Sequence, residues 1–233
     1  MKESVIEKML HINTSKAETR LDNVRYYSRY EPTPYDALET LFKHYTVSKK
    51  DHFVDFGSGK GRFSFFVNFF FNCACTSVEI IEEFHNKALL NFESYKKRNP
   101  GAIDKLFYVN EYAEKYEVSK FENKFYFFNP FSVNIFIAVV NQIIKSVESF
   151  GREVEIILYY PSDDYINFLE RRTAFTHVMD IPSKDFDKDV RNRFSIYRFG
   201  ESTDSLEEEF TLNINIKSVL YQETILCKKT KDK

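Results

Sequence analysis

A glycine-rich loop at residues 55–62 is the segment of this sequence best suited to chemistry. It reads Asp-Phe-Gly-Ser-Gly-Lys-Gly-Arg and directly follows a short apolar run. Glycines let a backbone turn sharply and approach a ligand without a side chain in the way. A helix that begins after such a loop also offers free N–H groups to an anionic group. The residue types therefore predict a small-molecule site at this loop.

The spacing of the glycines separates the possible ligands. A dinucleotide-binding loop needs glycine at its first, third and sixth positions, but Arg62 stands at the sixth and the third glycine comes early, at Gly61. A phosphate-binding P-loop ends in Gly-Lys-Ser or Gly-Lys-Thr, and Gly59-Lys60-Gly61 does not. The pattern that remains is acid-x-Gly-x-Gly-x-Gly, which argues against both of these ligand classes.

Two other segments carry groups that could act on a ligand. In Asn129-Pro130-Phe131, the amide and carbonyl oxygens could accept hydrogen bonds from an amino group while the Phe131 ring packs against a flat acceptor. A helix-capping Asn followed by a proline stop is the alternative. Upstream, residues 26–35 combine four tyrosines with two prolines that forbid a regular helix, which indicates either a lid or an ordinary packed loop.

Short apolar strands that alternate with helical segments position these residues. We expect a Rossmann-like α/β fold with a seven-stranded, mostly parallel sheet, helices on both faces, an N-terminal helical arm at 1–22 and a C-terminal β extension. In such a sheet, ligands bind at the carboxyl ends of the strands, where the glycine loop lies. The predicted strands are 53–56, 76–80, 106–109, 125–128, 154–160, 176–181 and 193–199, with an added strand or hairpin within 210–226. The predicted helices are 36–44, one that ends near 71, 81–97 and 135–150.

The predicted elements group into one main domain. Residues 1–35 form the arm and an aromatic lid loop, 36–200 form the ligand-binding domain, and 201–233 extend its sheet.

The composition limits the class of protein. Of 233 residues, 43% are hydrophobic and 17% aromatic, which suffices for one sizeable core and excludes a disordered chain. The 33 Lys and Arg nearly balance the 35 Asp and Glu, so a dedicated nucleic-acid binder is not favoured. Three cysteines without a CxxC pair favour a reduced, cytoplasmic protein. No membrane partner is expected, because the apolar run at 63–71 is too short to cross a bilayer, and no two histidines have metal-ligand spacing.

Over about residues 30–160, the sequence resembles the class I S-adenosylmethionine-dependent methyltransferases. In that family the glycine loop lies along the amino-acid part of the cofactor, and an acidic residue at the end of the second strand accepts both ribose hydroxyls, which implies this role for Glu79. The resemblance implies that Asn110, or Glu111 if the strand boundary shifts by one, reaches the adenine amino group. The residues implied to bind S-adenosylmethionine are Asp55, Gly57, Ser58, Gly59, Gly61, Glu79, Ile80, Asn110, Tyr30 and Thr33.

Two subgroups of this family resemble the chain in its other motifs. Asn129-Pro130-Phe131 is similar to the Asn/Asp-Pro-Pro-Tyr/Phe motif of enzymes that methylate amino nitrogens of adenine or glutamine, with one proline missing. The histone-lysine methyltransferases without a SET domain are similar in Tyr30-Glu31-Pro32-Thr33, in the glycine loop, in Val78-Glu79 and in an Asn-x-Phe after strand four. In such enzymes the upstream loop closes over the cofactor, so Tyr30, Glu31 and Thr33 are candidates for cofactor contact.

The resemblance implies in-line transfer of a methyl group from a sulfonium to a nucleophile. We expect the acceptor to be an amino nitrogen of a protein or small molecule, oriented by Asn129, Pro130 and Phe131. A nucleic-acid amino-methyltransferase and a catalytically silent binding module are the alternatives, and Arg62 disfavours a nicotinamide-dependent oxidoreductase. The aromatic side chains available to line an acceptor pocket are Tyr26, Tyr27, Tyr30, Phe131, Tyr159 and Tyr160.

Overall fold

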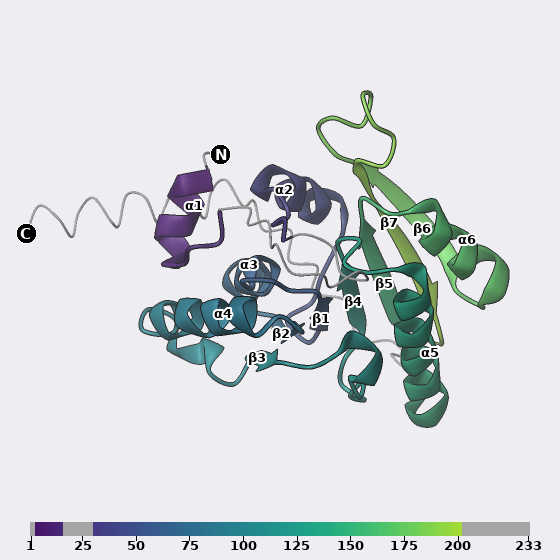
Figure 1. Ribbon diagram of the computed structural model, residues 1–233, viewed down its shortest axis with the longest axis horizontal. Coiled ribbons are helices and arrows are strands. Elements are labelled where there is room, and N and C mark those ends of the chain that lie inside the picture. The colour runs from purple at the N-terminus through teal and green to yellow at the C-terminus, as the bar shows by residue number, and fades with distance from the viewer. Residues whose placement is uncertain (1–2, 16–29, 202–233) are drawn as a thin grey trace, which may run out of the picture.

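A seven-stranded sheet forms the centre of the protein (Figure 1). The computed structural model describes residues 3–15 and 30–201. The strand order is β3-β2-β1-β4-β5-β7-β6, in which β3 to β5 run parallel and β7 is antiparallel to both of its neighbours. The predicted fold class is therefore confirmed. The strands are β1 (His52–Phe56), β2 (Ala74–Val78), β3 (Leu106–Val109), β4 (Lys124–Phe127), β5 (Val154–Tyr159), β6 (Thr176–Pro182) and β7 (Arg193–Phe199).

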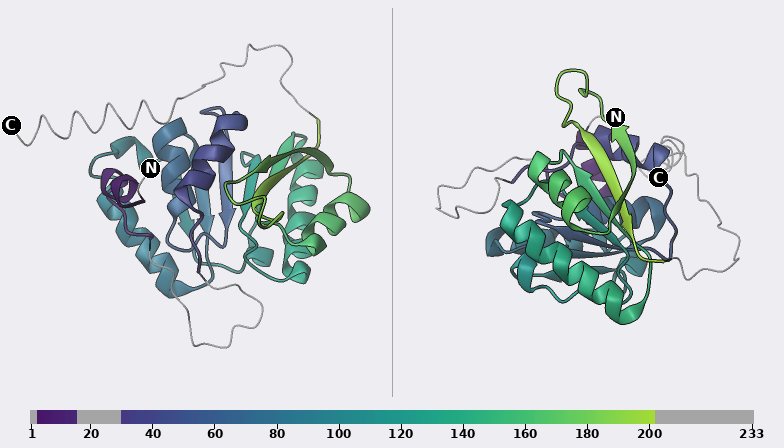
Figure 2. Two further views of the ribbon diagram at one scale, coloured as in Figure 1. Left: turned by 90° about the horizontal axis from the view of Figure 1, so that it is seen from above. Right: turned by 90° about the vertical axis from the view of Figure 1, so that its right-hand side faces the viewer.

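Helices connect the strands and cover both faces of the sheet (Figure 2). One hydrophobic core cluster lies between the sheet and the first three helices, and it includes Leu38, Phe53 and Phe66. The other lies between the opposite face and the last two helices, and it includes Phe127 and Phe136. The helices are α1 (Glu3–Leu10), α2 (Tyr35–His44), α3 (Arg62–Phe71), α4 (Glu82–Tyr95), α5 (Val133–Phe150) and α6 (Asp163–Arg172), with short 3₁₀ helices η1 (Pro100–Ala102) and η2 (Ala113–Lys115).

The N-terminal arm and the β5–β6 connection differ from the sequence-based expectation. The helical arm predicted for 1–22 is wrong for residues 11–15, because α1 ends at Leu10 and His11 takes a left-handed conformation with φ of 55°. Helix α6 was not predicted, although Ser162 caps it by accepting a hydrogen bond from the Tyr165 N–H. The strand predicted within 210–226 lies outside the described residues.

Helix α5 is the one described helix that is long and apolar enough to cross a membrane, by length and composition only. A core helix passes the same test. In this fold, Phe136, Val140 and Ile143 of α5 are fully buried in the second core cluster. Packing against the sheet therefore accounts for the apolar character of α5.

Candidate active site

The order of the strands creates one natural ligand position in the sheet. The chain passes from β1 outward to β2 and β3, and then returns to β4 on the other side of β1. The loops after β1 and β4 therefore leave the sheet in opposite directions, and a crevice opens between them at the carboxyl ends of the strands. The glycine loop follows β1 and Asn129 follows β4, so the structure brings these two predicted segments together at this point.

The glycine loop has the backbone conformation that its sequence predicts. Gly57, Gly59 and Gly61 all have positive φ, at 75°, 56° and 83°, where a side chain would be strained. The N–H groups of Gly57 and Ser58 donate to the Val78 carbonyl oxygen at 2.9 and 3.2 Å, which ties the loop to the end of β2. Helix α3 begins directly after the loop, so its N-terminal N–H groups lie at the same place.

The Glu79 carboxylate lies beside this loop. The side chain is 6% exposed, and its two oxygens accept hydrogen bonds from the N–H groups of Gly59 and Ile81, both at 2.8 Å. These bonds fix a carboxylate directly after β2, about 20 residues past the loop, where nucleotide-binding sheets hold a ribose. The backbone of Ile80 lies between Glu79 and Ile81, which this hydrogen bond joins.

Asp55 is a second buried carboxyl group, one residue before the end of β1. It lies in register with Ser77 of β2 and Tyr126 of β4, on the face that α3 covers. Burial, and second the Glu79 carboxylate, raise the pKa of Asp55 to about 8. The group therefore holds a proton at neutral pH until a cation comes close to it.

Asn110 joins the end of β3 to the Glu79 segment. Its side-chain N–H group donates to the carbonyl oxygens of Glu79 at 2.7 Å and Ile80 at 3.1 Å. The Glu111 carboxylate instead accepts a hydrogen bond from the N–H of Tyr112, the next residue. Of the two candidates for the adenine position, only Asn110 is hydrogen-bonded to the segment that carries Glu79.

Two of the three residues predicted from the aromatic loop, Tyr30 and Thr33, take different positions. The Tyr30 ring covers Gly59 so closely that a Cβ on the glycine would come within 2.2 Å of the Tyr30 Cε2. The Thr33 hydroxyl instead shares a 2.7 Å hydrogen bond with the buried Tyr126 hydroxyl. The Thr33 side chain therefore points into the core and not over the loop.

The Asn129-Pro130-Phe131 segment turns sharply after β4. Asn129 has a φ of 42°, in the left-handed region that Asn tolerates better than most residues. The Pro130 ring packs on Gly57, where an added Cβ would lie 2.5 Å from the Pro130 Cβ. The Phe131 ring is 5% exposed and packs edge-on against Phe127, 6.1 Å between centroids. That ring faces the core between the sheet and α5, and not the open edge of the sheet.

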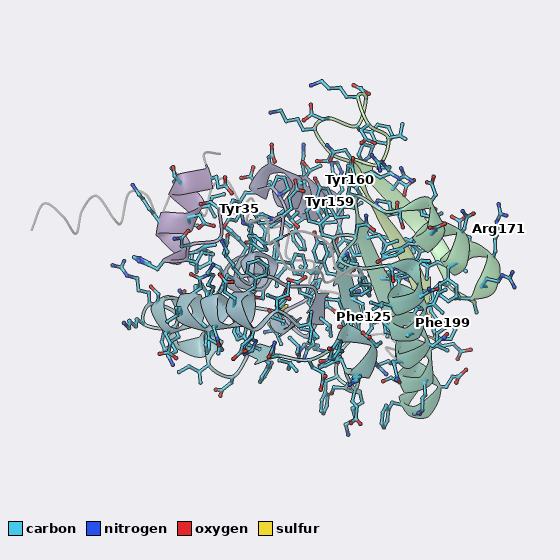
Figure 3. The ribbon with its side chains drawn as sticks, viewed as in Figure 1. Tyr35, Phe125, Tyr159, Tyr160, Arg171 and Phe199 are labelled. Atoms are coloured by element: carbon cyan, nitrogen blue, oxygen red, sulfur yellow. The ribbon has the colours of Figure 1, made fainter. Side chains whose placement is uncertain are left out.

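Sequence reasoning missed a polar cluster that borders this edge beyond β5. Tyr160 follows β5 with a φ of 51°, and its hydroxyl donates to Asp189 in the loop between β6 and β7. The Arg191 guanidinium lies 4.7 Å from the Tyr160 ring centroid and donates to the hydroxyl at 2.9 Å. Tyr159 and Tyr160 lie at the end of the sheet where this loop projects (Figure 3). Only pairing across the sheet brings Tyr160 and Asp189 together, so no local sequence signal could have found the cluster.

Carboxylates surround the two tyrosines at this edge. Burial is the largest cause that raises the pKa of Tyr159 to about 12, and the nearby carboxylates of Asp36 and Glu31 raise it further. The pKa of Tyr160 is also raised. The largest cause is the hydrogen bond from Tyr160 to Asp189, followed by burial, and Glu31 makes a smaller contribution. The rim beyond β5 therefore carries charges of both signs. The carboxylates of Glu31 and Asp36 lie near the tyrosines, and in the β6–β7 loop Asp189 pairs with Arg191 and Asp185 with Lys188.

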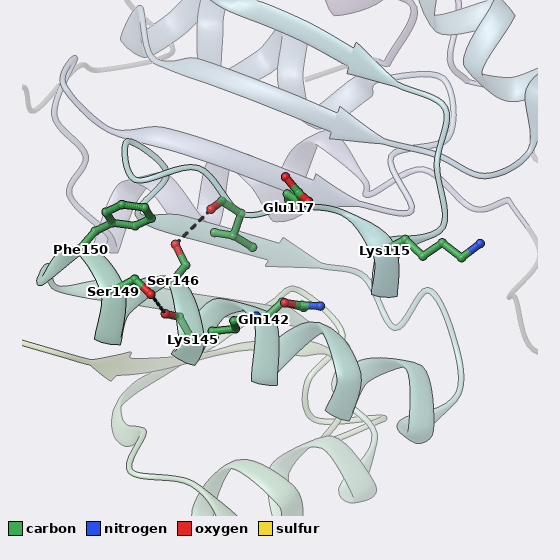
Figure 4. A pocket seen from close by; sticks show the side chains of 8 residues that line it. Lys115, Glu117, Gln142, Lys145, Ser146, Ser149 and Phe150 are labelled. Carbon is green, nitrogen blue, oxygen red and sulfur yellow. Dashed lines mark hydrogen bonds between the residues drawn. The ribbon is translucent and has the colours of Figure 1, made fainter.

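A shallow hollow of about 290 Å³ lies away from this edge, on the C-terminal half of α5 (Figure 4). Lys115, Lys145 and Phe150 contribute to its lining. Its Ser146 donates to the Val118 carbonyl oxygen at 3.1 Å, so the hydroxyl is already used within the fold. None of the residues predicted to act on a ligand lines this hollow.

The residues at the switch point fit S-adenosylmethionine. The Ser58 hydroxyl is buried in the glycine loop and has no hydrogen-bond partner within residues 3–15 and 30–201, as expected for a group that a ligand satisfies. Glu79 offers a carboxylate for ribose hydroxyls, and the start of α3 offers N–H groups to the cofactor carboxylate. In the same described ranges, no three His, Cys, Asp or Glu side chains gather where they could hold a metal ion.

Comparisons with known proteins agree with this site. The model of the family described as histone methylation protein DOT1 matches residues 18–128, which include the glycine loop, Glu79 and Asn110. No curated protein sequence matches the chain. Among solved structures, the human methyltransferase 10 domain containing protein is similar, with a TM-score of 0.51, 12% identity and coverage of 84% of this chain and 93% of that one. A Pyrococcus horikoshii protein proposed to be an RNA methyltransferase has a TM-score of 0.50, 15% identity and coverage of 88% and 100%.

Proposed function

We propose that this chain is a class I S-adenosylmethionine-dependent methyltransferase and that it methylates the amino nitrogen of a cationic acceptor, such as a basic protein side chain. The match of the DOT1 family model to residues 18–128 supports the first part of the proposal. The observation that carries the proposal is the packing of Pro130 on Gly57. This contact fixes Asn129 beside the loop that would lie along the cofactor.

S-adenosylmethionine supplies a methyl group on a positively charged sulfur, which leaves as a neutral thioether. The protein therefore needs to align the reactants more than to donate a proton, and alignment can supply about 7–11 kcal/mol of the barrier. The Asn129 side-chain oxygen and the Pro130 carbonyl oxygen are the acceptors that would orient an amino group at the end of β4. An amino group held by its hydrogens directs its lone pair toward the bond that forms.

The order of residues along the sheet edge sets the direction from which the acceptor arrives. Glu79 after β2 and the glycine loop after β1 hold the cofactor side, and Asn129 after β4 comes next. The acceptor then comes from the side of β5, where Tyr160 and the β6–β7 loop lie. On that side the exposed Glu31 carboxylate, near Tyr159 and Tyr160, would attract a cation.

The same side also supplies the surroundings that an amine nucleophile needs. A protonated amine has no lone pair, and burial among aromatic groups lowers the pKa of an amine. Tyr159 is 4% exposed and lies against Phe128, with 4.7 Å between the ring centroids. A charged rim outside an aromatic wall favours capture of a cation followed by loss of its proton.

RNA is the second candidate acceptor. One structural neighbour is proposed to be an RNA methyltransferase, and Asn129-Pro130-Phe131 resembles motifs that act on adenine amino groups. The carboxylates near Tyr159 and Tyr160 oppose a phosphate backbone, and the formal net charge of the chain is −2. The balance of charge favours the cationic acceptor.

A labelling experiment separates the two acceptors. The full chain is incubated with methyl-tritiated S-adenosylmethionine and either a mixture of basic proteins or total RNA. Label that enters protein, and that does not enter protein whose lysine amines were acylated before the incubation, supports the proposal. Label in RNA that ribonuclease releases, or label unchanged in Asn129→Gly, contradicts it.

A further inference from the structure

A buried polar network joins helix α1 to the glycine loop. The side chains of Glu7, Thr14 and Arg62 are 7%, 0% and 3% exposed. Glu7 belongs to α1 and Arg62 is the first residue of α3, directly after Gly61. Glu7 and Thr14 precede the residues matched by the DOT1 family model, so the network joins a part of the chain outside that match to the cofactor loop.

Thr14 is the centre of this network. Its N–H donates to a Glu7 carboxylate oxygen at 2.7 Å, and its hydroxyl donates to the other. The same hydroxyl oxygen accepts a 2.7 Å hydrogen bond from the Arg62 Nε. The Thr14 carbonyl oxygen accepts a 2.8 Å hydrogen bond from the Tyr30 hydroxyl, which ties the network to the ring over Gly59.

Further contacts close the network on two sides. Arg62 donates to the Thr33 carbonyl oxygen at 3.1 Å, so it holds Thr33 directly and Tyr30 through Thr14. The Asn91 side chain of α4 accepts from the N–H of Asn13 at 2.9 Å and donates to the Lys60 carbonyl oxygen at 3.1 Å. Asn91 therefore bridges Asn13 to the glycine loop.

We propose that Glu7, Thr14 and Arg62 form an N-terminal clasp that positions Tyr30 over Gly59 and thereby sets the affinity for S-adenosylmethionine. They are positioning residues, because they act through the Tyr30 ring. The clasp turns a helix outside the family match into part of the cofactor site. Undocking α1 frees the Tyr30 hydroxyl and weakens the cover on the loop.

The test is a double-mutant cycle on the full chain, read by calorimetric titration with S-adenosylhomocysteine. Glu7→Gln removes the negative charge and one of the two acceptor oxygens that face Thr14 and Arg62, and Tyr30→Phe removes the hydrogen bond to the Thr14 carbonyl oxygen. We expect each to weaken binding about 3- to 10-fold. Because the two contacts act in series, the double variant should bind little more weakly than the weaker single variant. No acceptor enters this assay, so its outcome is independent of the proposed acceptor.

Two variants control for general effects. Tyr95→Phe removes another buried tyrosine hydrogen bond, 2.9 Å to Asn68, and Lys8→Gln removes an exposed charge on α1. Both should bind S-adenosylhomocysteine like the native protein. Binding by Tyr30→Phe within twofold of Tyr95→Phe would overturn the proposal, and this comparison holds even if Glu7→Gln does not fold. The proposal would also be overturned if the double variant lost affinity by the product of the two single-variant factors, because the two contacts would then act independently.

Discussion

Pro130 lies so close to Gly57 that a Cβ on the glycine would approach the Pro130 Cβ to 2.5 Å. The segment expected to hold the acceptor therefore rests directly on the loop expected to hold the cofactor. Neither segment can move away from the crevice without separating this contact. The close approach explains why the position needs glycine, in addition to its φ of 75°.

Gly57→Ala should therefore reduce both stability and cofactor binding. A left-handed conformation costs a residue with a side chain about 1–2 kcal/mol, and displacement of Pro130 adds to this cost. We expect a lower melting temperature and loss of measurable S-adenosylhomocysteine binding by calorimetry. Gly101→Ala is the matched control, because nothing lies within 4 Å of a Cβ at that position. Binding by Gly57→Ala equal to that by Gly101→Ala would show that the contact does not matter.

Asp55 should make the stability of the cofactor-free protein depend on pH. In the folded protein the group keeps its proton up to about pH 8, whereas an aspartate in an unfolded chain loses it near pH 4. Unfolding then releases a proton between these limits, so the free energy of unfolding falls as pH rises from about 4 to about 8 and levels off above. Asp55→Asn should remove this decrease, as urea titrations at several pH values would show. If the free energy of unfolding depended on pH in the same way in the native protein and in Asp55→Asn, the raised pKa of Asp55 would be contradicted.

Asn129 should be needed for transfer and not for cofactor binding. Replacement by Gly removes the amide and keeps the left-handed backbone, so we expect cofactor affinity within about twofold of native and a loss of transfer of at least about 100-fold. Calorimetry with S-adenosylhomocysteine and a methyl-transfer assay measure the two effects. If the glycine variant still turns over at the native rate, the acceptor is oriented by other groups.

The carboxylates of the rim should set the affinity for the acceptor. Glu31→Gln removes an exposed negative charge, and Asp189→Asn removes a half-buried one and leaves Arg191 without this carboxylate. We expect each variant to raise the acceptor KM about two- to fivefold at low salt. Glu148→Gln, an exposed residue of α5, is the matched control. A lower KM in the rim variants would indicate an anionic acceptor and would contradict the proposed function.

Much of the cofactor side was predictable because its signals are local. The apolar strand, the glycines and the following helix are adjacent in sequence, so the loop could be placed before the structure was known. The family resemblance also indicated Glu79 and Asn110, and in the structure each directly follows a short strand. The structure moves β2 two residues earlier than predicted, to Ala74–Val78, and leaves Glu79 directly after it.

The remaining features depend on contacts between distant residues. Arg62 was used only to exclude a dinucleotide loop, and its bonds to Glu3, Thr14 and Thr33 come from segments 29 to 59 residues away. The inward turn of Thr33 depends on Tyr126, which lies 93 residues further on. The same holds for Tyr160 and Asp189, 29 residues apart. A sequence pattern carries no information about such pairs until the sheet order is known.

The central claim is that the crevice between β1 and β4 holds S-adenosylmethionine, with Glu79 on the ribose. Its most direct test is calorimetric titration of the native protein and Glu79→Gln with S-adenosylhomocysteine. The account predicts binding by the native protein and a loss of about 10- to 100-fold in the variant, because hydrogen bonds to a charged group are worth about 1.5–3 kcal/mol. Equal affinity in the two proteins would contradict the account.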